Sequence, residues 1–185
     1  MRYPASETAE KHVRILAHAS RLFREHGFDG VTVSEIMKST GLTHGPFYNH
    51  FSSKDALIAE CIEHASVKAL AGMAAAEDSP AAMVALVAAY LSPAHRDAPG
   101  KGCMLPALGA EVGRAPGAQG AFTAHIQAVI DRFQRHFPWS QKRNARRDAI
   151  RMLSAMVGAQ VLARAVNSPG LADELLEAVR SEYAG

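Results

Sequence analysis

Apolar residues recur along this chain at the spacing of an α-helix, and this periodicity limits its fold more than any other feature. Near the N-terminus, Val13, Leu16, Ala17, Ser20 and Phe23 share one helical face. No stretch shows the sustained apolar–polar alternation of a half-buried strand. Aromatic residues make up only 6% of the chain, which also favours helices over a β-sandwich or barrel. The pattern predicts an all-α protein of about nine helices.

The composition excludes several classes of protein. With 48% apolar and 21% charged residues, the 185-residue chain is not expected to be disordered. Its two cysteines cannot build a disulfide framework, and no Cys/His cluster indicates a metal site. The charged first twenty residues lack a secretory apolar core, and the longest apolar run, residues 81–91, is too short to span a membrane. We expect a cytoplasmic protein without membrane contact, metal or cofactor.

Local signals predict two short helices between longer ones. Thr32–Glu35 reads as a capping box that opens a short helix, and Gly41 ends that helix in a left-handed conformation. Thr43 then caps a second short helix over residues 44–50, and Ser52–Asp55 is a second capping box that opens a long helix. Two short helices joined by a glycine turn predict a helix-turn-helix.

The remainder of the chain is predicted to be helical with one interruption. Ser79–Pro80 and Ser168–Pro169 combine a capping serine with a first-turn proline, so each predicts a helix start. Residues 92–121 are rich in proline and glycine, and we expect at most one short helix there, near residues 103–112. Further helices are predicted over residues 121–137 and 149–166, with a final one after Pro169.

The stretch from Ile15 to Leu57 resembles the tetracycline-repressor (TetR) family of bacterial transcriptional regulators. The resemblance is carried by Gly27-Phe28, Thr32-Val33 and above all the run from Gly41 to Phe51, followed by Lys54. Met37 and Thr40 stand where the family usually has alanine. The resemblance implies a three-helix helix-turn-helix DNA-binding domain over residues 1–52 and a larger helical ligand-binding and dimerisation domain over residues 53–185.

The resemblance places the second short helix in the major groove of double-stranded DNA. Tyr48 can donate its hydroxyl to a phosphate, whereas Asn49 carries groups able to read base edges. For His50, a phosphate contact and a helix-capping role both stay open, and Phe47 and Phe51 are predicted to be core. The predicted DNA-binding residues are Thr32, Thr43, His44, Gly45, Pro46, Tyr48, Asn49, His50 and Lys54.

A ligand cavity is predicted in the C-terminal part, where the resemblance implies a small, mostly apolar effector. Cys103 opens the short helix of the interrupted region, and a thiol at a helix N-terminus would have a lowered pKa and react with electrophiles. The alternative is a small buried hydrophobe, which is the role predicted for Cys61. Candidate lining residues are Tyr90, Cys103, Met104, Phe122, His125, Met152, Met156 and Gln160.

A homodimer is expected from the last two long helices. Small residues on the first of them would let another helix approach closely, and the second carries an apolar face that needs covering. The candidate interface residues are Ser154, Ala155, Gly158, Leu171, Leu175 and Val179. A basic run at residues 142–151 fits either a second nucleic-acid patch or a solvated helix start.

Taken with the resemblance, these features predict a ligand-responsive repressor that binds a near-palindromic operator as a homodimer. Two alternatives stay open at this point. The chain could be an architectural DNA-binding protein without ligand control. It could also be a small helical thiol enzyme with Cys103 as nucleophile and His125 as base, although no motif supplies an orienting group or an oxyanion site, so we do not expect an enzyme.

Overall fold

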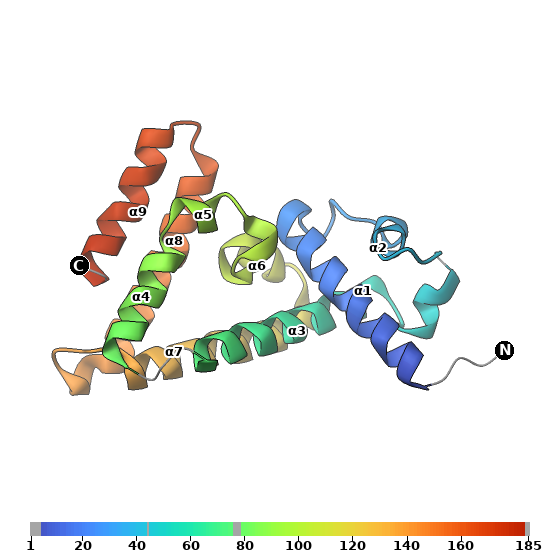
Figure 1. Ribbon diagram of the computed structural model, residues 1–185, viewed down its shortest axis with the longest axis horizontal. Helices are drawn as coiled ribbons and strands as arrows, with labels where there is room; N and C mark the ends of the chain where they lie inside the picture. Colours follow the sequence, from blue (N-terminus) through green and yellow to red (C-terminus); the bar gives the residue numbers. More distant parts are fainter. Residues whose placement is uncertain (1–4, 44, 76–78, 184–185) are drawn as a thin grey trace.

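The computed structural model describes residues 5–43, 45–75 and 79–183, and within these it contains helices and no strands (Figure 1). The predicted all-α fold is therefore confirmed. The α-helices are α1 (Ala5–His26), α2 (Val33–Ser39), α3 (Lys54–Ala75), α4 (Pro80–Tyr90), α5 (Pro93–Arg96), α6 (Met104–Val112), α7 (Pro116–His136), α8 (Ala145–Ala165) and α9 (Pro169–Tyr183). Three short 3₁₀ helices join them in the same residues: η1 (Gly45–Asn49), η2 (Pro99–Lys101) and η3 (Lys142–Asn144).

The strongest local signals form as predicted. Thr32 caps α2, because its Oγ1 accepts a hydrogen bond from Glu35 N at 3.2 Å while Glu35 Oε2 accepts one from Thr32 N at 2.7 Å. Gly27 and Gly41 end their helices at φ 77° and 74°, a region that side chains other than glycine enter only with strain. Ser79 caps α4 through Ala82 N. Short-range chemistry thus sets these boundaries.

Three predicted elements need correction. The helix predicted over residues 44–50 is the 3₁₀ helix η1, since a segment this short gains few α-helical hydrogen bonds. Ser53 rather than Ser52 caps α3, because its Oγ accepts from Ala56 N at 3.0 Å. The interrupted region also contains more structure than expected, namely α5 and η2, and α7 already begins at Pro116.

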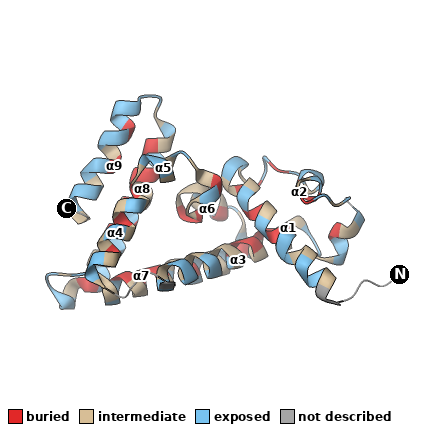
Figure 2. Cartoon of the chain, in the orientation of Figure 1, coloured by how far each residue is buried: buried red, intermediate tan, exposed pale blue. Residues whose placement is uncertain are grey.

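The buried side chains form two apolar clusters. Buried residues lie on helices in both halves of the molecule (Figure 2). The N-terminal cluster joins α1, α2, η1 and the first part of α3, around Phe23, Ile36 and Phe47. The C-terminal cluster joins α4, α7, α8 and α9 around Phe133 and Met152. Helix α6 belongs to both, because Met104, Leu108 and Val112 lie in the N-terminal cluster and Leu105 in the C-terminal one. The predicted boundary between residues 52 and 53 stays a prediction.

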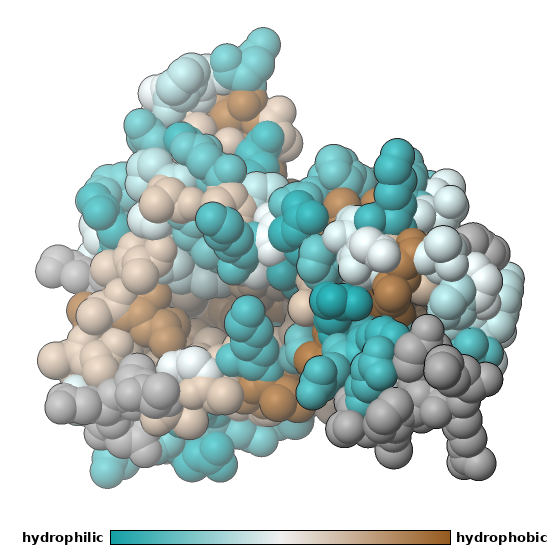
Figure 3. Space-filling view, turned by 45° about the vertical axis from the view of Figure 1, so that its right-hand side comes forward, coloured by the Kyte–Doolittle hydropathy of each residue, from teal (hydrophilic) through white to brown (hydrophobic). Residues whose placement is uncertain are grey.

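Helix α6 lies between the two halves of the molecule, above the long neighbouring helices α3 and α7 (Figure 1). In the space-filling view, apolar residues gather in a recess between the halves, and hydrophilic residues border it (Figure 3). Among the described residues, no helix is long and apolar enough to cross a membrane.

Candidate DNA interface and effector cavity

The helix η1 has one buried and one outward-facing side. Phe47 is fully buried and its ring centroid lies 5.5 Å from that of Phe51, which confirms both residues as core. On the outer side, Asn49 is exposed and Tyr48 keeps 66% of its surface in solvent. A Cβ atom built on Gly45 would meet nothing within 4 Å, so the backbone there is open to a large partner. The aromatic anchor therefore fixes η1 while presenting its polar groups outward.

Residues on both sides of η1 extend this polar surface. Thr32 and Thr43 are exposed, Pro46 is half-buried, and Lys54 is the first residue of α3. The predicted contact His44 lies outside the described residues. A helix start carries unpaired N–H groups and a partial positive charge, so Lys54 lies where an anion is favoured.

His50 differs from its polar neighbours because it is partly enclosed. Its ring centroid lies 5.8 Å from that of His12. Burial first, then the positive charges of His12 and Lys11, lower the pKa of His50. The ring is therefore neutral at pH 7, which favours a hydrogen bond over an ionic contact with phosphate.

A cavity of about 760 Å³ lies between α1, α3, α4, α6, α7 and α8. Five of the predicted lining residues do line it: Tyr90, Cys103, Met104, His125 and Met156. The other three lie in the surrounding packing. Met152 is fully buried in the C-terminal cluster, Phe122 packs against both clusters, and Gln160 Nε2 donates to the Tyr90 carbonyl at 2.5 Å.

Cys103 caps helix α6 from the cavity wall. Its Sγ accepts a hydrogen bond from Leu105 N at 3.4 Å, and its own N–H donates to His95 Nε2 at 3.0 Å. Burial raises the pKa of the Cys103 thiol and outweighs the hydrogen bond from Leu105 N. The predicted lowering of this pKa is therefore wrong, because desolvation of the thiolate exceeds the effect of the helix start. The thiol resembles that of the core residue Cys61, whose pKa burial also raises.

His125 has a structural partner that sequence reasoning did not find. Its Nδ1 lies 2.9 Å from Ser66 Oγ, which reaches it from α3. Burial lowers the pKa of His125, so the ring is neutral at pH 7. Its polar partner is therefore a serine of the opposite helix rather than the Cys103 thiol that a catalytic pair would require.

The sequence reading also missed a group of cations along one edge of the cavity. Arg21 and Arg24 reach it from α1, Lys68 from α3 and Lys101 from η2. Charged residues on amphipathic helices are normally solvated, so no signal in the sequence marks these four. The packing of α1 beside both η2 and α3 brings them together.

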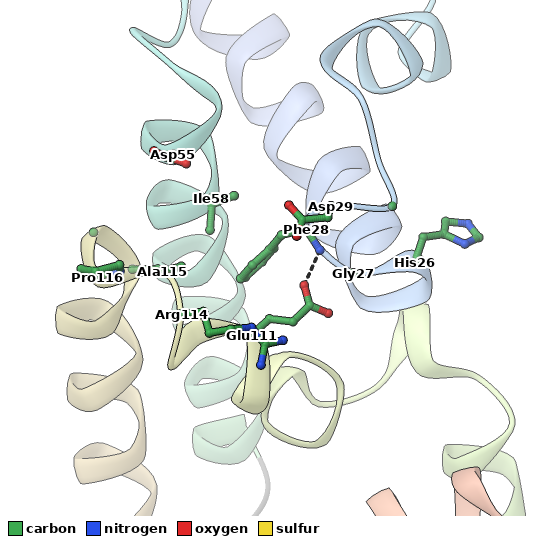
Figure 4. A pocket seen from close by; sticks show the side chains of 13 residues that line it. His26, Gly27, Phe28, Asp29, Asp55, Ile58, Glu111, Arg114, Ala115 and Pro116 are labelled. Carbon is green, nitrogen blue, oxygen red and sulfur yellow. Dashed lines mark hydrogen bonds between the residues drawn. The ribbon is translucent and has the colours of Figure 1, made fainter.

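The C-terminal end of α6 is hydrogen-bonded to the turn that follows α1 (Figure 4). Glu111 Oε2 accepts a hydrogen bond from Phe28 N at 2.5 Å. A Cβ atom on Gly27 would lie 2.5 Å from Glu111 Oε1, so only glycine leaves room for this carboxylate. The residues around it line a second cavity of about 430 Å³. One short helix thus contacts both the cavity of about 760 Å³ and the N-terminal cluster.

Helices α8 and α9 expose an apolar face that corresponds in part to the predicted interface. Ser154 and Leu171 are exposed, Ala155 and Leu175 are half-buried, and a Cβ atom on Gly158 would meet nothing within 4 Å. Val179 instead packs against the C-terminal cluster. Three large apolar side chains of α8 are also exposed, although the prediction did not include them: Ile150, Val161 and Leu162.

The basic run before and within α8 is exposed. Arg146 bonds to Asp131 at 3.0 Å and Arg147 to Asp148 at 3.1 Å. These pairs fit the solvated helix start rather than a dedicated anion surface.

Comparisons with known proteins agree with this geometry. Residues 15–61 match the family described as bacterial regulatory proteins, tetR family. Over 82 residues the chain is 33% identical to the transcriptional repressor AcnR of Corynebacterium jeikeium, and the match covers 44% of this chain and 43% of AcnR. The chain thus spans less than half of that relative's length.

Solved structures match over nearly the whole chain. The reduced form of NemR from Escherichia coli gives a TM-score of 0.79 at 20% identity, covering 94% of this chain and 95% of NemR. A TetR-family regulator from Agrobacterium tumefaciens gives a TM-score of 0.79 at 19% identity, covering 96% and 99%. At this level of identity, the structural matches establish the fold alone. The match of residues 15–61 to the tetR family rests on sequence. Residues 15–61 therefore carry the sequence pattern of the tetR family of bacterial regulatory proteins, and the chain has the fold of the solved structures that it matches.

Proposed function

We propose that this chain is a cytoplasmic repressor that binds a near-palindromic operator as a homodimer and releases it when an effector fills the cavity. One observation carries the proposal. Helix α6 lines the cavity with Cys103, its N-cap, and Met104, and the same helix inserts Met104, Leu108 and Val112 into the cluster that anchors η1. A shift of α6 on effector binding would therefore move the support of the DNA-contacting surface.

The outward side of η1 supplies the proposed DNA contacts. Tyr48 and Lys54 would contact phosphates, whereas Asn49, beside the undescribed His44, would read base edges in the major groove. The open backbone at Gly45 allows the groove wall to approach closely. The neutral ring of His50 would add a hydrogen bond at most.

Homodimer formation would place two such surfaces on one operator. The exposed apolar face of α8 and α9 is the proposed contact, since two copies of this pair would form a four-helix interface about a two-fold axis. Half-sites one helical turn apart, about 34–36 Å, would then match two recognition helices.

Selection of bound DNA from a random pool tests the regulator directly. A near-palindromic consensus is expected, and Tyr48→Phe should weaken binding to consensus and unrelated DNA alike, because its partner is a phosphate. Asn49→Ala should instead relax preference at particular base positions. The matched control is Gln141→Ala, an exposed polar residue before η3. Enrichment of no sequence, or a variant Tyr48→Phe that binds like wild type, would contradict the proposal.

Filling the cavity separates a ligand-controlled repressor from an architectural DNA-binding protein. Met156 lines the cavity and is almost fully buried. Met156→Trp should occupy part of the space and blunt release of operator by any effector found. If no ligand of the cavity alters DNA binding, the protein is an architectural DNA-binding protein.

A further inference from the structure

The cavity has an uneven distribution of charge. Its lining includes Arg21, Arg24, Lys68 and Lys101, and none of the described residues that line it is an aspartate or glutamate. Away from this edge, the walls come from the apolar side chains Met73, Leu86, Leu105, Val129, Phe133, Leu153 and Met156. A cationic edge beside an apolar interior is complementary to a molecule with an anionic head and an apolar body.

Arg24 is the cation that the fold holds most firmly. Its Nη2 and Nε donate to the Gly100 carbonyl at 2.6 and 3.2 Å, and its Nη1 donates to Ser20 Oγ at 2.9 Å. Burial lowers the pKa of Arg24, yet the guanidinium remains charged at pH 7 because its ordinary value is 12.5. Neutral oxygens satisfy its donors, and no ion pair with a described carboxylate compensates its charge.

The other cations differ in how far the protein neutralises them. Arg21 forms an ion pair with Glu25 at 2.9 Å, so it contributes little net charge. Lys68 and Lys101 are exposed and form no ion pair with any described residue. Arg24, Lys68 and Lys101 therefore line the cavity without an ion pair to a described residue, although the nearby Glu25 carboxylate favours the charged form of Arg24. A partly buried charge gains free energy when an anion replaces the water it has lost.

We infer that the effector is an organic anion, with a carboxylate-like head held at Arg24, Lys68 and Lys101 and an apolar body in the interior. This inference rests on the proposed function of the cavity and names the chemical class of its ligand. The cavity volume of about 760 Å³ suits a drug-sized molecule, since such sites span roughly 300–1,000 Å³. The head would compete with the Gly100 carbonyl for Arg24, and so would act on the contact between α1 and the loop before α6.

Calorimetric titration of the full chain with three probes of one chain length tests the inference. Dodecanoate, dodecanol and dodecyltrimethylammonium carry negative, neutral and positive heads, and each is used below its micelle concentration. Dodecanoate is expected to bind about tenfold more tightly than dodecanol, because charge-assisted hydrogen bonds are stronger than neutral ones. Pyrenebutyrate, in a parallel arm, shows whether the apolar body is a chain or a ring system.

Two sets of variants test whether the cations of the cavity cause the preference for dodecanoate over dodecanol. Arg24→Gln should bring dodecanoate affinity down to that of dodecanol without weakening dodecanol. The double variant Lys68→Gln/Lys101→Gln, whose two side chains are exposed, gives the same test if Arg24→Gln does not fold. Arg143→Gln, an exposed cation on η3, is the matched control and should keep the full preference.

The possible results separate this inference from the proposed function. Equal affinity for dodecanoate and dodecanol, preference for the cation, or no binding of any probe would overturn the inference while operator binding stands. A protein that prefers anions through Arg24 but selects no DNA sequence would overturn the repressor and leave the ligand class intact.

Discussion

At the residue scale, the two cysteines show how burial decides thiol chemistry. Burial raises the pKa of both Cys61 and Cys103, and only Cys103 has a helix start to oppose that effect. A raised pKa leaves little thiolate at neutral pH, and thiolate is the reactive form. An effector is thus expected to bind beside Cys103 without forming a bond to it.

Reaction with a disulfide reagent at pH 7 tests this view. In the native protein both thiols should react at least about tenfold more slowly than an exposed thiol, and urea should make all of them react alike. Ser181→Cys supplies the exposed reference, because residue 181 lies on the solvent side of α9. If Cys103 in the native protein reacts as fast as this reference thiol, the prediction is wrong and an electrophilic effector could form a bond to Cys103.

A pair of glycines at helix ends offers a second residue-scale prediction. Gly27 and Gly41 share a left-handed φ, but only at Gly27 would a Cβ atom meet another group, the Glu111 carboxylate. Gly41→Ala should lower the free energy of unfolding by about 1–2 kcal/mol, the strain of this conformation. Gly27→Ala should cost about 1 kcal/mol more, because displacing Glu111 leaves Phe28 N without its partner.

Urea denaturation measures both losses. The additional loss at Gly27 should vanish in a Glu111→Ala background, since no carboxylate remains to be displaced. Equal losses at the two glycines in the wild-type background would show that the Glu111 contact contributes nothing to stability.

At the scale of elements, local signals foretold most helices and failed at particular places. Thr32 and Ser79 act through atoms a few residues away, so their caps could be recognised without the fold. Ser92–Pro93 carries the same signal as Ser79–Pro80 and does start α5, yet the many prolines and glycines around it hid a helix of four residues. The register of α3 was misjudged because Ser52 and Ser53 can each act as a cap.

The candidate site was less predictable than the helices. Five of eight cavity residues could be foreseen because the resemblance and the apolar pattern indicated this region. The cationic edge could not, since it arises only where α1 and α3 meet the loop before α6. The partner of His125 likewise comes from a different helix, fifty-nine residues away in the sequence.

The exposed face of α8 is the predicted dimer interface. Leu162 keeps 52% of its surface in solvent and belongs, with Ile150 and Val161, to a group of exposed apolar side chains on α8. Such a group, unlike a single exposed residue, fits a surface that a partner covers. Leu162→Asp should convert a dimer into monomers and weaken operator binding, because each monomer would hold one half-site.

Light scattering at micromolar concentration gives the mass directly. Val67→Asp is the matched control, since Val67 is even more exposed but lies on α3. This variant should remain a dimer. A wild-type monomer, or a dimer that survives Leu162→Asp, would place the interface elsewhere.

At the scale of the whole molecule, four fully or partly buried histidines predict acid sensitivity. Burial lowers the pKa values of His50, His64, His95 and His125 below their ordinary value of 6.5. The unfolded chain then binds more protons than the folded one as the pH falls through about 6.5, so the free energy of unfolding falls with it.

Urea denaturation between pH 7.5 and pH 5 should show this loss of stability, and His125→Gln should make the dependence shallower. The carboxyls of Glu35 and Asp97 have lowered pKa values, so their contribution is lost only as the pH falls below 4.5 and 3.8, outside this window. Stability that is constant from pH 7.5 to pH 5 would contradict the prediction.

The sharing of α6 between two apolar clusters has a consequence for building chimeric regulators. A graft that transfers only the first three helices to another effector domain would remove Met104, Leu108 and Val112 from beside Phe28 and Ile62. The transplanted part would then expose apolar surface that its new host is not shaped to cover. A DNA-reading module from this protein should therefore function in a foreign host only when α6, or a helix of the same shape, travels with it.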